Sequence, residues 1–424
     1  CAYVCPHAAI RPFLLNDEEL TAAPAGTQTK PAIGKELAGY KFRIQVSPLD
    51  CTGCGNCADV CPAKTKALVM KPLESQMTEE PRFEYMDQKV GYKKVVEPNN
   101  VKNSQFTQPL FEFSGACAGC GETPYVKLVS QLFGENVIVA NATGCSSIYS
   151  GTFPTIPYTT NKCGRGPAWA NSLFEDNAEF GFGMRLAVDQ NRTTLKSYVE
   201  KVVSNEKTPA DLKEALEGAM AHFENSKTEE AIAAQDKAKE VLAKYADVEC
   251  PDLAKVRELQ DYFTDKSVWI IGGGRWANDI GYGGIDHVLA QDKDVNILVL
   301  DTEVYSNTGG QASKSTPTGA VAKFATGGKR TYKKNMGLMS MSYGYVYVAS
   351  VALGADRAQT LKAFQEAEAY KGPSIIFAYA PCIAHGIDMS KTQTEQKRAV
   401  EAGYFPLYRY NPANPEAPFT WDAK

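Results

Sequence analysis

The sequence has no long apolar run and little net charge. Its 424 residues carry 45 Lys and Arg against 49 Asp and Glu, which gives a formal net charge of −4 and a pI of about 5.8. This balance provides no general attraction to nucleic acid or to anionic membranes, so we expect neither as a partner. No apolar segment approaches the length that crosses a bilayer and no signal peptide opens the chain, which predicts a soluble protein.

The chain also lacks an initiating methionine, because it begins inside a cysteine motif at Cys1. We therefore expect it to be part of a longer polypeptide. Its length leaves room for two or three domains, each with an ample core.

Cysteine, in contrast, is abundant, with 12 residues. A secreted disulfide scaffold would be small and rich in loops, whereas this chain contains long segments that alternate between strand-like and helix-like patterns. The composition therefore favours thiolates that bind iron–sulfur clusters in a reducing compartment.

The run Cys51-x-x-Cys54-x-x-Cys57-x-x-x-Cys61-Pro62 has the spacing of bacterial ferredoxins. Its two short spacings let three thiolates converge on one 4Fe–4S cluster, while the fourth reaches a neighbouring cluster. Zinc is the alternative for a pair of cysteines two residues apart, but a zinc site closes with four ligands and rarely has this triple spacing.

The segment Cys1-x-x-x-Cys5-Pro6 is the end of a second copy of this run. The repeat predicts crossed ligation, in which each run lends its last cysteine to the cluster of the other. One cluster would be bound by Cys5, Cys51, Cys54 and Cys57. The second would be bound by Cys1 and Cys61 together with two cysteines outside this chain.

A third group of cysteines is spread along the chain. Cys117-x-x-Cys120 precedes an expected helix at Thr123–Phe133, and this spacing alone suits either metal ligation or redox chemistry. Cys145 follows an expected strand at 137–140, and Cys382 follows another at 374–378. Both cysteines lie just beyond the carboxyl ends of strands, the edge where open α/β sheets bind ligands.

Two further buried-strand patterns, at 268–271 and 295–300, also end in glycine and small polar residues. The first continues as Gly272-Gly273-Gly274 and resembles a dinucleotide-binding fingerprint, which is a weak signal alone. A nicotinamide site requires an acidic residue about 20 positions further on, whereas the acid that ends the second strand, Asp301, is more distant.

The segment Asp301-Thr-Glu-Val-Tyr-Ser-Asn-Thr-Gly-Gly-Gln311 resembles the diphosphate-binding loop of thiamine diphosphate enzymes, and most closely that of the pyruvate:ferredoxin oxidoreductases. The resemblance extends over almost all of the chain, but over only roughly the last third of the family's single-chain form. It implies a 4Fe–4S cluster beside the thiamine, bound by Cys117, Cys120, Cys145 and Cys382.

The resemblance also implies roles at the thiamine site. The Thr302 hydroxyl and the Val304 carbonyl would bind Mg²⁺, and Asn307 and Glu122 would be catalytic. The residues expected to bind the cofactor are Glu122, Cys145, Gly273, Gly274, Arg275, Trp276, Thr302, Glu303, Val304, Tyr305, Ser306 and Asn307.

The chain departs from the family pattern at one glycine-rich turn. The family's Gly-Gly-Asp-Gly-Trp-Ala is here Gly272-Gly273-Gly274-Arg275-Trp276-Ala277, so Gly274 replaces the carboxylate that binds Mg²⁺. We expect weaker Mg²⁺ binding, while Arg275 is in a position to bind the diphosphate directly. Cys163 stands where the family has glutamate. Cys163 and Cys250 match no ligand motif and are expected to be structural.

These observations predict an α/β thiamine diphosphate-binding domain with a parallel sheet and a helical insertion, preceded by a small α+β two-cluster ferredoxin-like domain. The expected boundaries are 1–85 for the ferredoxin-like domain, 86–110 for a linker, 111–400 for the thiamine domain with an insertion at about 193–263, and 401–424 for an extended tail.

The function implied by the resemblance is oxidative decarboxylation of pyruvate with coenzyme A, with electrons passing through three 4Fe–4S clusters to ferredoxin or flavodoxin. The implied cofactors are these clusters, thiamine diphosphate and Mg²⁺. The implied setting is a homodimer in the cytoplasm or in the matrix of an anaerobic organelle, with further N-terminal domains on the same polypeptide. Two alternatives remain: the same chemistry on another 2-oxo acid, or an electron-relay protein that has lost thiamine through Gly274 and Arg275.

Overall fold

The computed structural model describes residues 1–152 and 154–423. These residues form two compact units, which we call the sheet unit (1–179 with 269–424) and the helical unit (180–268). Within the described residues, no helix combines the length and the apolar character needed to span a bilayer.

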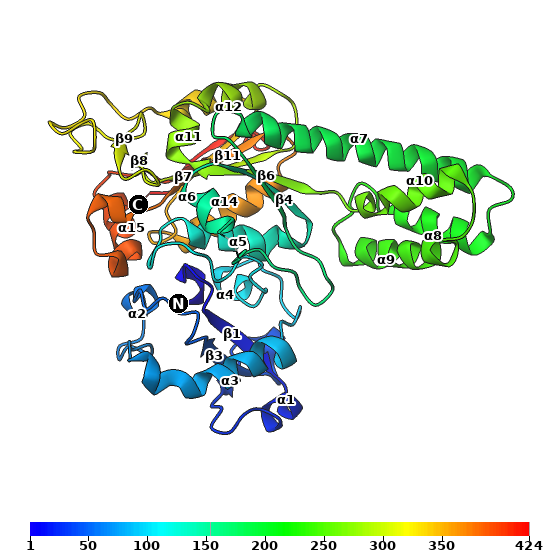
Figure 1. Ribbon diagram of the computed structural model, residues 1–424, viewed down its shortest axis with the longest axis horizontal. Coiled ribbons are helices and arrows are strands. Elements are labelled where there is room, and N and C mark those ends of the chain that lie inside the picture. The colour runs from blue at the N-terminus through cyan, green and yellow to red at the C-terminus, as the bar shows by residue number, and fades with distance from the viewer. Residues whose placement is uncertain (153, 424) are drawn as a thin grey trace. The chain divides into compact units, whose positions relative to one another are not determined.

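The sheet unit is built on an eight-stranded sheet (Figure 1). Its strands, in spatial order, are β13 (Phe419–Trp421), β12 (Tyr408–Tyr410), β10 (Tyr347–Val351), β11 (Ser374–Tyr379), β7 (Asn296–Asp301), β6 (Ser267–Gly273), β4 (Val137–Ala142) and β5 (Ala168–Ser172). Neighbours pair in parallel from β10 to β6 and between β4 and β5, and β12 and β13 form an antiparallel edge. The predicted buried strands are thus confirmed as strands of one sheet.

Helices cover both faces of this sheet, as the continuous apolar strands require. On one face lie α5 (Thr123–Phe133) and α14 (Arg357–Ala369), where the buried Trp269 ring stacks on Phe133 and on Phe364 at centroid distances of 5.7 and 5.6 Å. Figure 1 shows α11 (Gly274–Asn278) and α12 (Tyr282–Leu289) on the other side. Three further helices lie in the same part of the sheet unit: α6 (Cys145–Ser150), α13 (Met336–Met341) and α15 (Thr392–Glu401).

The first residues of the sheet unit form a small α+β domain. Strands β1 (Ile10–Leu15) and β3 (Lys41–Val46) pair antiparallel, and β2 (Lys30–Pro31) joins β3. The short helices are α1 (Asp17–Thr21) and α2 (Asn56–Asp59). The predicted fold class, a small α+β domain before a parallel-sheet domain with a helical insertion, is confirmed.

The segment 86–110, expected to be a linker, is packed instead. It follows α3 (Glu80–Tyr85) as a short π-helix (Met86–Val90) and contains α4 (Val101–Ser104). Met86 and Val90 are buried against Phe13 and Leu15 of β1. The segment looks polar in the sequence, but widely spaced apolar residues anchor it to the small domain, and Asp87 and Lys93 pair there with Arg11 and Glu19.

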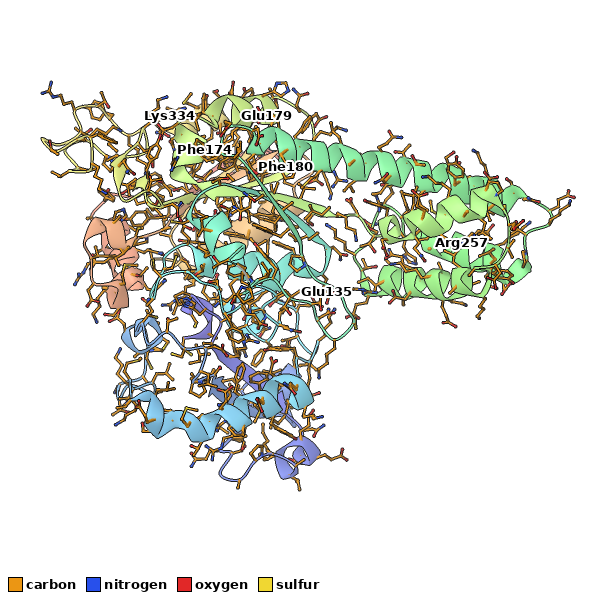
Figure 2. All side chains as sticks on the ribbon, in the orientation of Figure 1. Glu135, Phe174, Glu179, Phe180, Arg257 and Lys334 are labelled. Atoms are coloured by element: carbon orange, nitrogen blue, oxygen red, sulfur yellow. The ribbon has the colours of Figure 1, made fainter. Side chains whose placement is uncertain are left out.

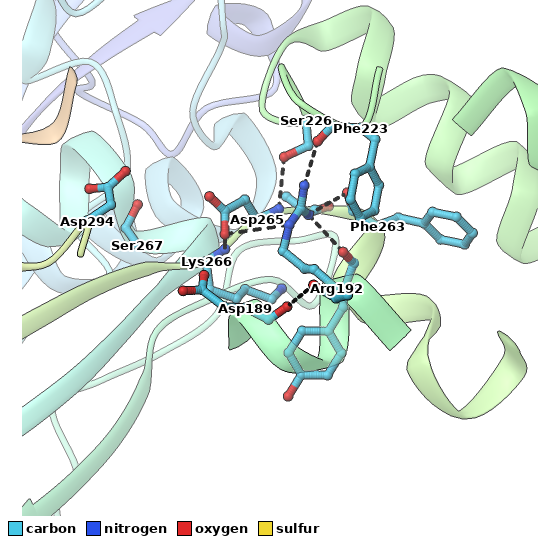
Figure 3. Close-up of polar contacts among 12 residues, drawn as sticks. Asp189, Arg192, Phe223, Ser226, Phe263, Asp265, Lys266, Ser267 and Asp294 are labelled. Atoms are coloured by element: carbon cyan, nitrogen blue, oxygen red, sulfur yellow. Dashed lines mark hydrogen bonds and ion pairs between the residues drawn. The ribbon is translucent and has the colours of Figure 1, made fainter. Parts of the chain in front are cut away.

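The helical unit contains α8 (Ala210–Ala221), α9 (Glu229–Lys244), α10 (Pro251–Leu259) and most of α7 (Asn177–Ser204), with a core of its own that includes Leu216 and Phe263. α7 begins well before the insertion's expected start at 193. Figure 3 shows how the loops are tied: the buried Arg192 guanidinium donates to the carbonyls of Phe223 (2.5 Å) and Phe263 (3.0 Å).

The tail at 401–424, expected to be extended, contributes β12 and β13 to the edge of the chain's own sheet. Arg409 of β12 fixes it, because its guanidinium pairs with Glu366 of α14 (2.7 Å) and with Asp422 (2.9 Å). Its strands therefore complete this sheet.

Candidate functional site

A cavity of about 150 Å³ lies where β4, β7 and β11 end. Four segments that are far apart in the sequence contribute to it: three follow these strands, as expected for the carboxyl edge of a parallel sheet, and the fourth precedes α5. It is lined by Gly115, Ala116, Cys117, Cys120, Glu122, Cys145, Ile148, Tyr149, Thr302, Ser306, Asn307, Pro381, Cys382, Ile383 and Met389.

All four cysteines of the third group line this cavity. Burial raises the pKa of the Cys145 thiol first of all, and the neighbouring Glu122, Cys120, Cys382 and Cys117 raise it further. The negative charge of one thiolate makes it harder for a neighbouring thiol to ionise. These pKa effects therefore show that the four thiols lie near one another. A bound cation would reverse the effect by stabilising the thiolates.

Glycine allows these loops to meet. A Cβ at Gly121, beside Cys120, would lie 2.5 Å from the carbonyl oxygen of Pro381, the residue before Cys382. Gly119, with φ of 76°, would place a Cβ 2.3 Å from the Met389 carbonyl. Only glycine permits so close an approach, so the Cys117–Cys120 loop and the Cys382 loop are fitted directly to each other.

Among the residues that the structure describes, no three His, Cys, Asp or Glu side chains lie close enough to hold a single metal ion. A 4Fe–4S cluster makes a different demand, because each of its four thiolates binds a separate iron atom. The donor set in the cavity, four cysteines on three loops, fits that demand in kind and number.

Glu122 presents an unpaired carboxylate oxygen in this cavity. The side chain is 4% exposed, and its Oε2 has no hydrogen-bond partner among the described residues. Burial raises the pKa of Glu122 to about 7, while the nearby Tyr149 hydroxyl acts in the opposite direction. Such a group exchanges a proton near neutral pH, and an unpaired oxygen on a cavity wall indicates a missing ligand.

The loop after β7 places the two expected magnesium ligands side by side. The Thr302 hydroxyl donates to the Val304 carbonyl at 3.2 Å and accepts from the Ser306 hydroxyl at 2.6 Å. Asn307 extends to the cysteines, with its Oδ1 at 3.9 Å from the Cys145 Sγ. The Thr302 hydroxyl and the Val304 carbonyl are oxygen ligands of the kind that Mg²⁺ prefers, but no carboxylate stands beside them as a third ligand.

The acidic residues nearest this loop are already paired. Asp301 accepts hydrogen bonds from the Ser315 hydroxyl and the Lys333 ammonium, both at 2.5 Å, and Glu303 holds the same lysine at 2.8 Å. Tyr404 donates to the other Glu303 oxygen at 2.6 Å. Glu303, expected to bind the cofactor, thus has both carboxylate oxygens occupied and a strained φ of 61°.

Gly274 and Arg275 begin α11 beside this network, outside the lining of the cavity. A Cβ at Gly274 would lie 2.7 Å from Oδ1 of Asp301, so Asp301 occupies the space that an acidic residue at 274 would need. As the sequence indicated, the family's carboxylate is missing from this position, and the neighbouring carboxylates of Asp301 and Glu303 are already paired.

Arg275 is held between two aromatic rings. Its guanidinium carbon lies 4.4 Å from the ring centroid of Phe174 and 4.5 Å from that of Tyr305. Figure 2 labels Phe174 in the region of α11 and α12. Nη1 is 3.5 Å from the Thr308 hydroxyl, and the buried Nε has no partner among the described residues. A fixed cation with an unpaired donor and no carboxylate partner suits an anionic ligand.

The cysteines near the start of the chain also form a group. Burial raises the pKa of Cys57 to about 11, and the thiols of Cys5, Cys54 and Cys51 raise it as well. Cys5 therefore lies near Cys51, Cys54 and Cys57, and its binding of one cluster with them remains a prediction. Cys61 does not share this surrounding: hydrogen bonds from main-chain amides lower the pKa of its thiol, including one from Ala67 at 3.3 Å.

Sequence reasoning missed two buried groups that connect these loops. His7 lies 3.1 Å from the Ala116 carbonyl and 3.4 Å from the Thr52 hydroxyl, so it links residues beside Cys117 and Cys51. Lys127 of α5 binds the main chain of residues 2–5. A signal for Lys127 was present, because it is the only charged residue in the apolar helix 123–133.

Two domain families match the chain. The 4Fe-4S dicluster domain matches residues 1–65, and the C-terminal TPP-binding domain of thiamine pyrophosphate enzymes matches residues 254–378. The chain thus combines a region similar to a 4Fe-4S dicluster domain with a region similar to the TPP-binding domain of thiamine pyrophosphate enzymes.

The similarity of almost the whole chain to individual proteins is more specific than these two domain matches. The pyruvate:ferredoxin oxidoreductase of Moorella thermoacetica is 60% identical over 97% of this chain and 35% of the relative. The pyruvate-flavodoxin oxidoreductase of Enterobacter agglomerans is 54% identical over 100% of this chain and 36% of the relative. A mitochondrial pyruvate dehydrogenase [NADP(+)] of Euglena gracilis is 49% identical over 100% of this chain and 24% of the relative.

The chain is therefore homologous, over almost its whole length, to part of the pyruvate:ferredoxin and pyruvate-flavodoxin oxidoreductases, and the resemblance predicted from the 301–311 loop is confirmed. It spans about a third of the length of these relatives.

Proposed function

We propose that the whole protein oxidises pyruvate with coenzyme A, giving acetyl-CoA, CO₂, a proton and two electrons. The electrons leave singly through three 4Fe–4S clusters to ferredoxin or flavodoxin. The observation that carries the proposal is the cavity where four cysteines, Glu122, Thr302 and Asn307 meet. The names of the relatives support the substrate and the acceptors.

When bound, thiamine pyrophosphate would supply the electron sink that a 2-oxo acid needs in order to lose CO₂. The chain's own residues would bind and orient it. Asn307 would donate its amide to the cofactor or substrate, and Glu122 would exchange a proton at Oε2. Cys117, Cys120, Cys145 and Cys382 would hold the cluster that receives the electrons.

At the diphosphate, Thr302 and Val304 would provide oxygens for Mg²⁺, as their adjacency supports. The backbone of Gly273, Gly274 and Trp276 and the loop residues Glu303, Tyr305 and Ser306 would shape the rest of this site. Because Gly274 brings no carboxylate, Arg275 would neutralise part of the diphosphate charge directly. We also propose that the protein is a homodimer of the cytoplasm or of an anaerobic organelle matrix.

The test is reduction of ferredoxin that depends on both pyruvate and coenzyme A, measured with the full-length protein purified without oxygen. Turnover supports the proposal. Turnover with another 2-oxo acid but not with pyruvate would redirect the substrate assignment. Reduction of NADP⁺ without added ferredoxin would favour the acceptor named for the Euglena relative.

A second candidate is an electron-relay protein without thiamine, which Gly274 and the pairing of Asp301 favour. Chemical analysis distinguishes it from the enzyme. Iron and sulfide in the purified protein with no thiamine pyrophosphate, and no binding of added cofactor, would establish the relay.

A further inference from the structure

A lysine is buried in α5 without a carboxylate partner. Lys127 lies in the middle of the helix and is 2% exposed. Its Nζ donates to three main-chain oxygens, those of Ala2, Tyr3 (3.1 Å) and Cys5 (3.2 Å). No carboxylate among the described residues forms an ion pair with it. The ammonium therefore binds the segment that carries Cys1 and Cys5 only through hydrogen bonds to neutral main-chain carbonyls.

A buried ammonium is stable only where negative charge lies near it. Carbonyl dipoles supply part of that stabilisation. The Cys5 carbonyl accepts from Nζ at 3.2 Å, so a cluster bound by Cys5 with Cys51, Cys54 and Cys57 would place the compensating anion beside the ammonium.

A 4Fe–4S cluster with four thiolates is such an anion. The negative charges of its thiolates and sulfides together exceed the positive charge of its irons. Reduction adds one electron, which converts one ferric iron to ferrous, and the cluster gains one further negative charge. A cation held nearby stabilises the reduced form more than the oxidised form and so raises the reduction potential.

We propose that Lys127 is the buried counter-charge of the iron–sulfur cluster bound by Cys5, and that it raises the potential of this cluster. The inference rests on the proposed function for the ligand set, Cys5 with Cys51, Cys54 and Cys57. It assigns Lys127 a positioning and electrostatic role, since the lysine touches the main chain of the ligand segment. A favourable potential at this cluster draws electrons away from the thiamine cavity.

The experiment is a potentiometric titration of the full-length protein, without oxygen, followed by electron paramagnetic resonance. Lys127→Gln keeps a hydrogen-bond donor and removes the charge, whereas Lys127→Arg keeps the charge. The control is Lys102→Gln, because Lys102 is an exposed lysine that also donates to a carbonyl, that of Ile33 at 2.9 Å. A Cys57→Ser variant identifies the signal of the cluster in question.

We expect Lys127→Gln to retain its iron and to shift the potential of this one cluster downward. At the wild-type midpoint its ratio of reduced to oxidised cluster should fall about tenfold, a shift of about 59 mV for one electron. The other clusters, the Lys127→Arg variant and the Lys102→Gln control should keep their potentials.

An unchanged potential in Lys127→Gln overturns the proposal. If Lys127→Gln loses the cluster while Lys127→Arg retains it, the requirement for charge is supported. Loss from both variants shows a packing role alone and overturns it. Absence of every cluster signal from the unmodified protein is a separate result, because it overturns the proposed function itself.

Discussion

The helical unit and the carboxyl edge of the sheet differ in whether their buried polar groups have hydrogen-bond or ion-pair partners. In the helical unit, Arg185 pairs with Asp189 (2.7 Å) and Asp265 (3.0 Å), and Arg192 donates to three carbonyls and stacks on Phe223 at 3.9 Å. Of the described residues with a buried side-chain nitrogen or oxygen that lacks a partner, all lie in the sheet unit.

At the sheet edge, such groups coincide with the candidate site. Glu122 and Arg275 each have a buried polar atom without a partner, and Tyr149 of the cavity wall has another. Other such atoms lie elsewhere in the sheet unit, for example in Arg82, Asn103 and Arg357. Because buried polar groups are nearly always satisfied in folded proteins, those at the candidate site indicate a ligand that completes them.

The largest effect that would test this contrast is the loss of a cysteine from the cavity. We expect Cys120→Ser to remove the cluster beside it and to lower pyruvate-dependent ferredoxin reduction by more than about 100-fold, a loss of roughly 3 kcal/mol or more in barrier terms. Iron content and turnover are the measurements. Cys250→Ser is the matched control, because Cys250 lies in the helical unit and should leave both values unchanged. Equal iron in the two variants would contradict the assignment.

The second effect concerns the helical unit. Arg192→Met keeps most of the apolar stem but removes the donors to Tyr262, Phe263 and Phe223, whose carbonyls then lie buried without these partners. We expect a loss of about 3 kcal/mol from the stability of this unit. Hydrogen exchange across α8–α10 measures it. Lys201→Met, on the same helix but exposed, is the control. Cluster signals and cofactor binding should persist.

Much of this architecture was predictable from the sequence because it depends on local patterns. The apolar runs that form β4, β6, β7 and β11, the helix 123–133 and the cysteine spacings each lie within a short segment. Their convergence at one edge followed from the rule for parallel strands.

The missed features depend on contacts between distant residues. Neither the ion pair of Asp301 with Lys333 nor the fit of Gly121 against Pro381 leaves a local pattern. Lys127 stands out as a charge in an apolar helix, but its partners in residues 2–5 cannot be read from that helix. The packed segment 86–110 was missed for a related reason, since its few anchoring residues are scattered among charged ones.

A smaller effect is expected at Arg275. Arg275→Gly removes a cation that no carboxylate satisfies, so thiamine pyrophosphate should bind about tenfold more weakly, or about 1.4 kcal/mol, when Mg²⁺ is chelated. Calorimetry with and without chelator measures the difference. Arg330→Gly, an exposed arginine of the same domain, serves as the control. If cofactor binding requires Mg²⁺ equally in wild type and Arg275→Gly, the direct role of the arginine is wrong.

The smallest effect is a pH dependence confined to the helical unit. Burial pushes the pKa of Asp265 upward, but the charges of Arg185, Arg192 and Lys227 outweigh burial and hold this pKa below its usual value. The folded-state pKa is thus depressed, so the stabilisation is fully present above the unfolded value of about 3.9 and is lost as the pH falls through the folded value.

Asp265→Asn should therefore lower the stability of the helical unit by about 1 kcal/mol at neutral pH and by less at pH 3, so that the two stability curves converge in acid. Denaturant unfolding at several pH values, followed by exchange in α8–α10, measures this. Asp247→Asn, at an exposed site in the same unit, should follow the wild type throughout. A constant difference between Asp265→Asn and wild type across pH would mean that Asp265 acts through hydrogen bonds rather than charge, and the contrast between a charge-balanced helical unit and an unbalanced sheet edge would lose its electrostatic basis.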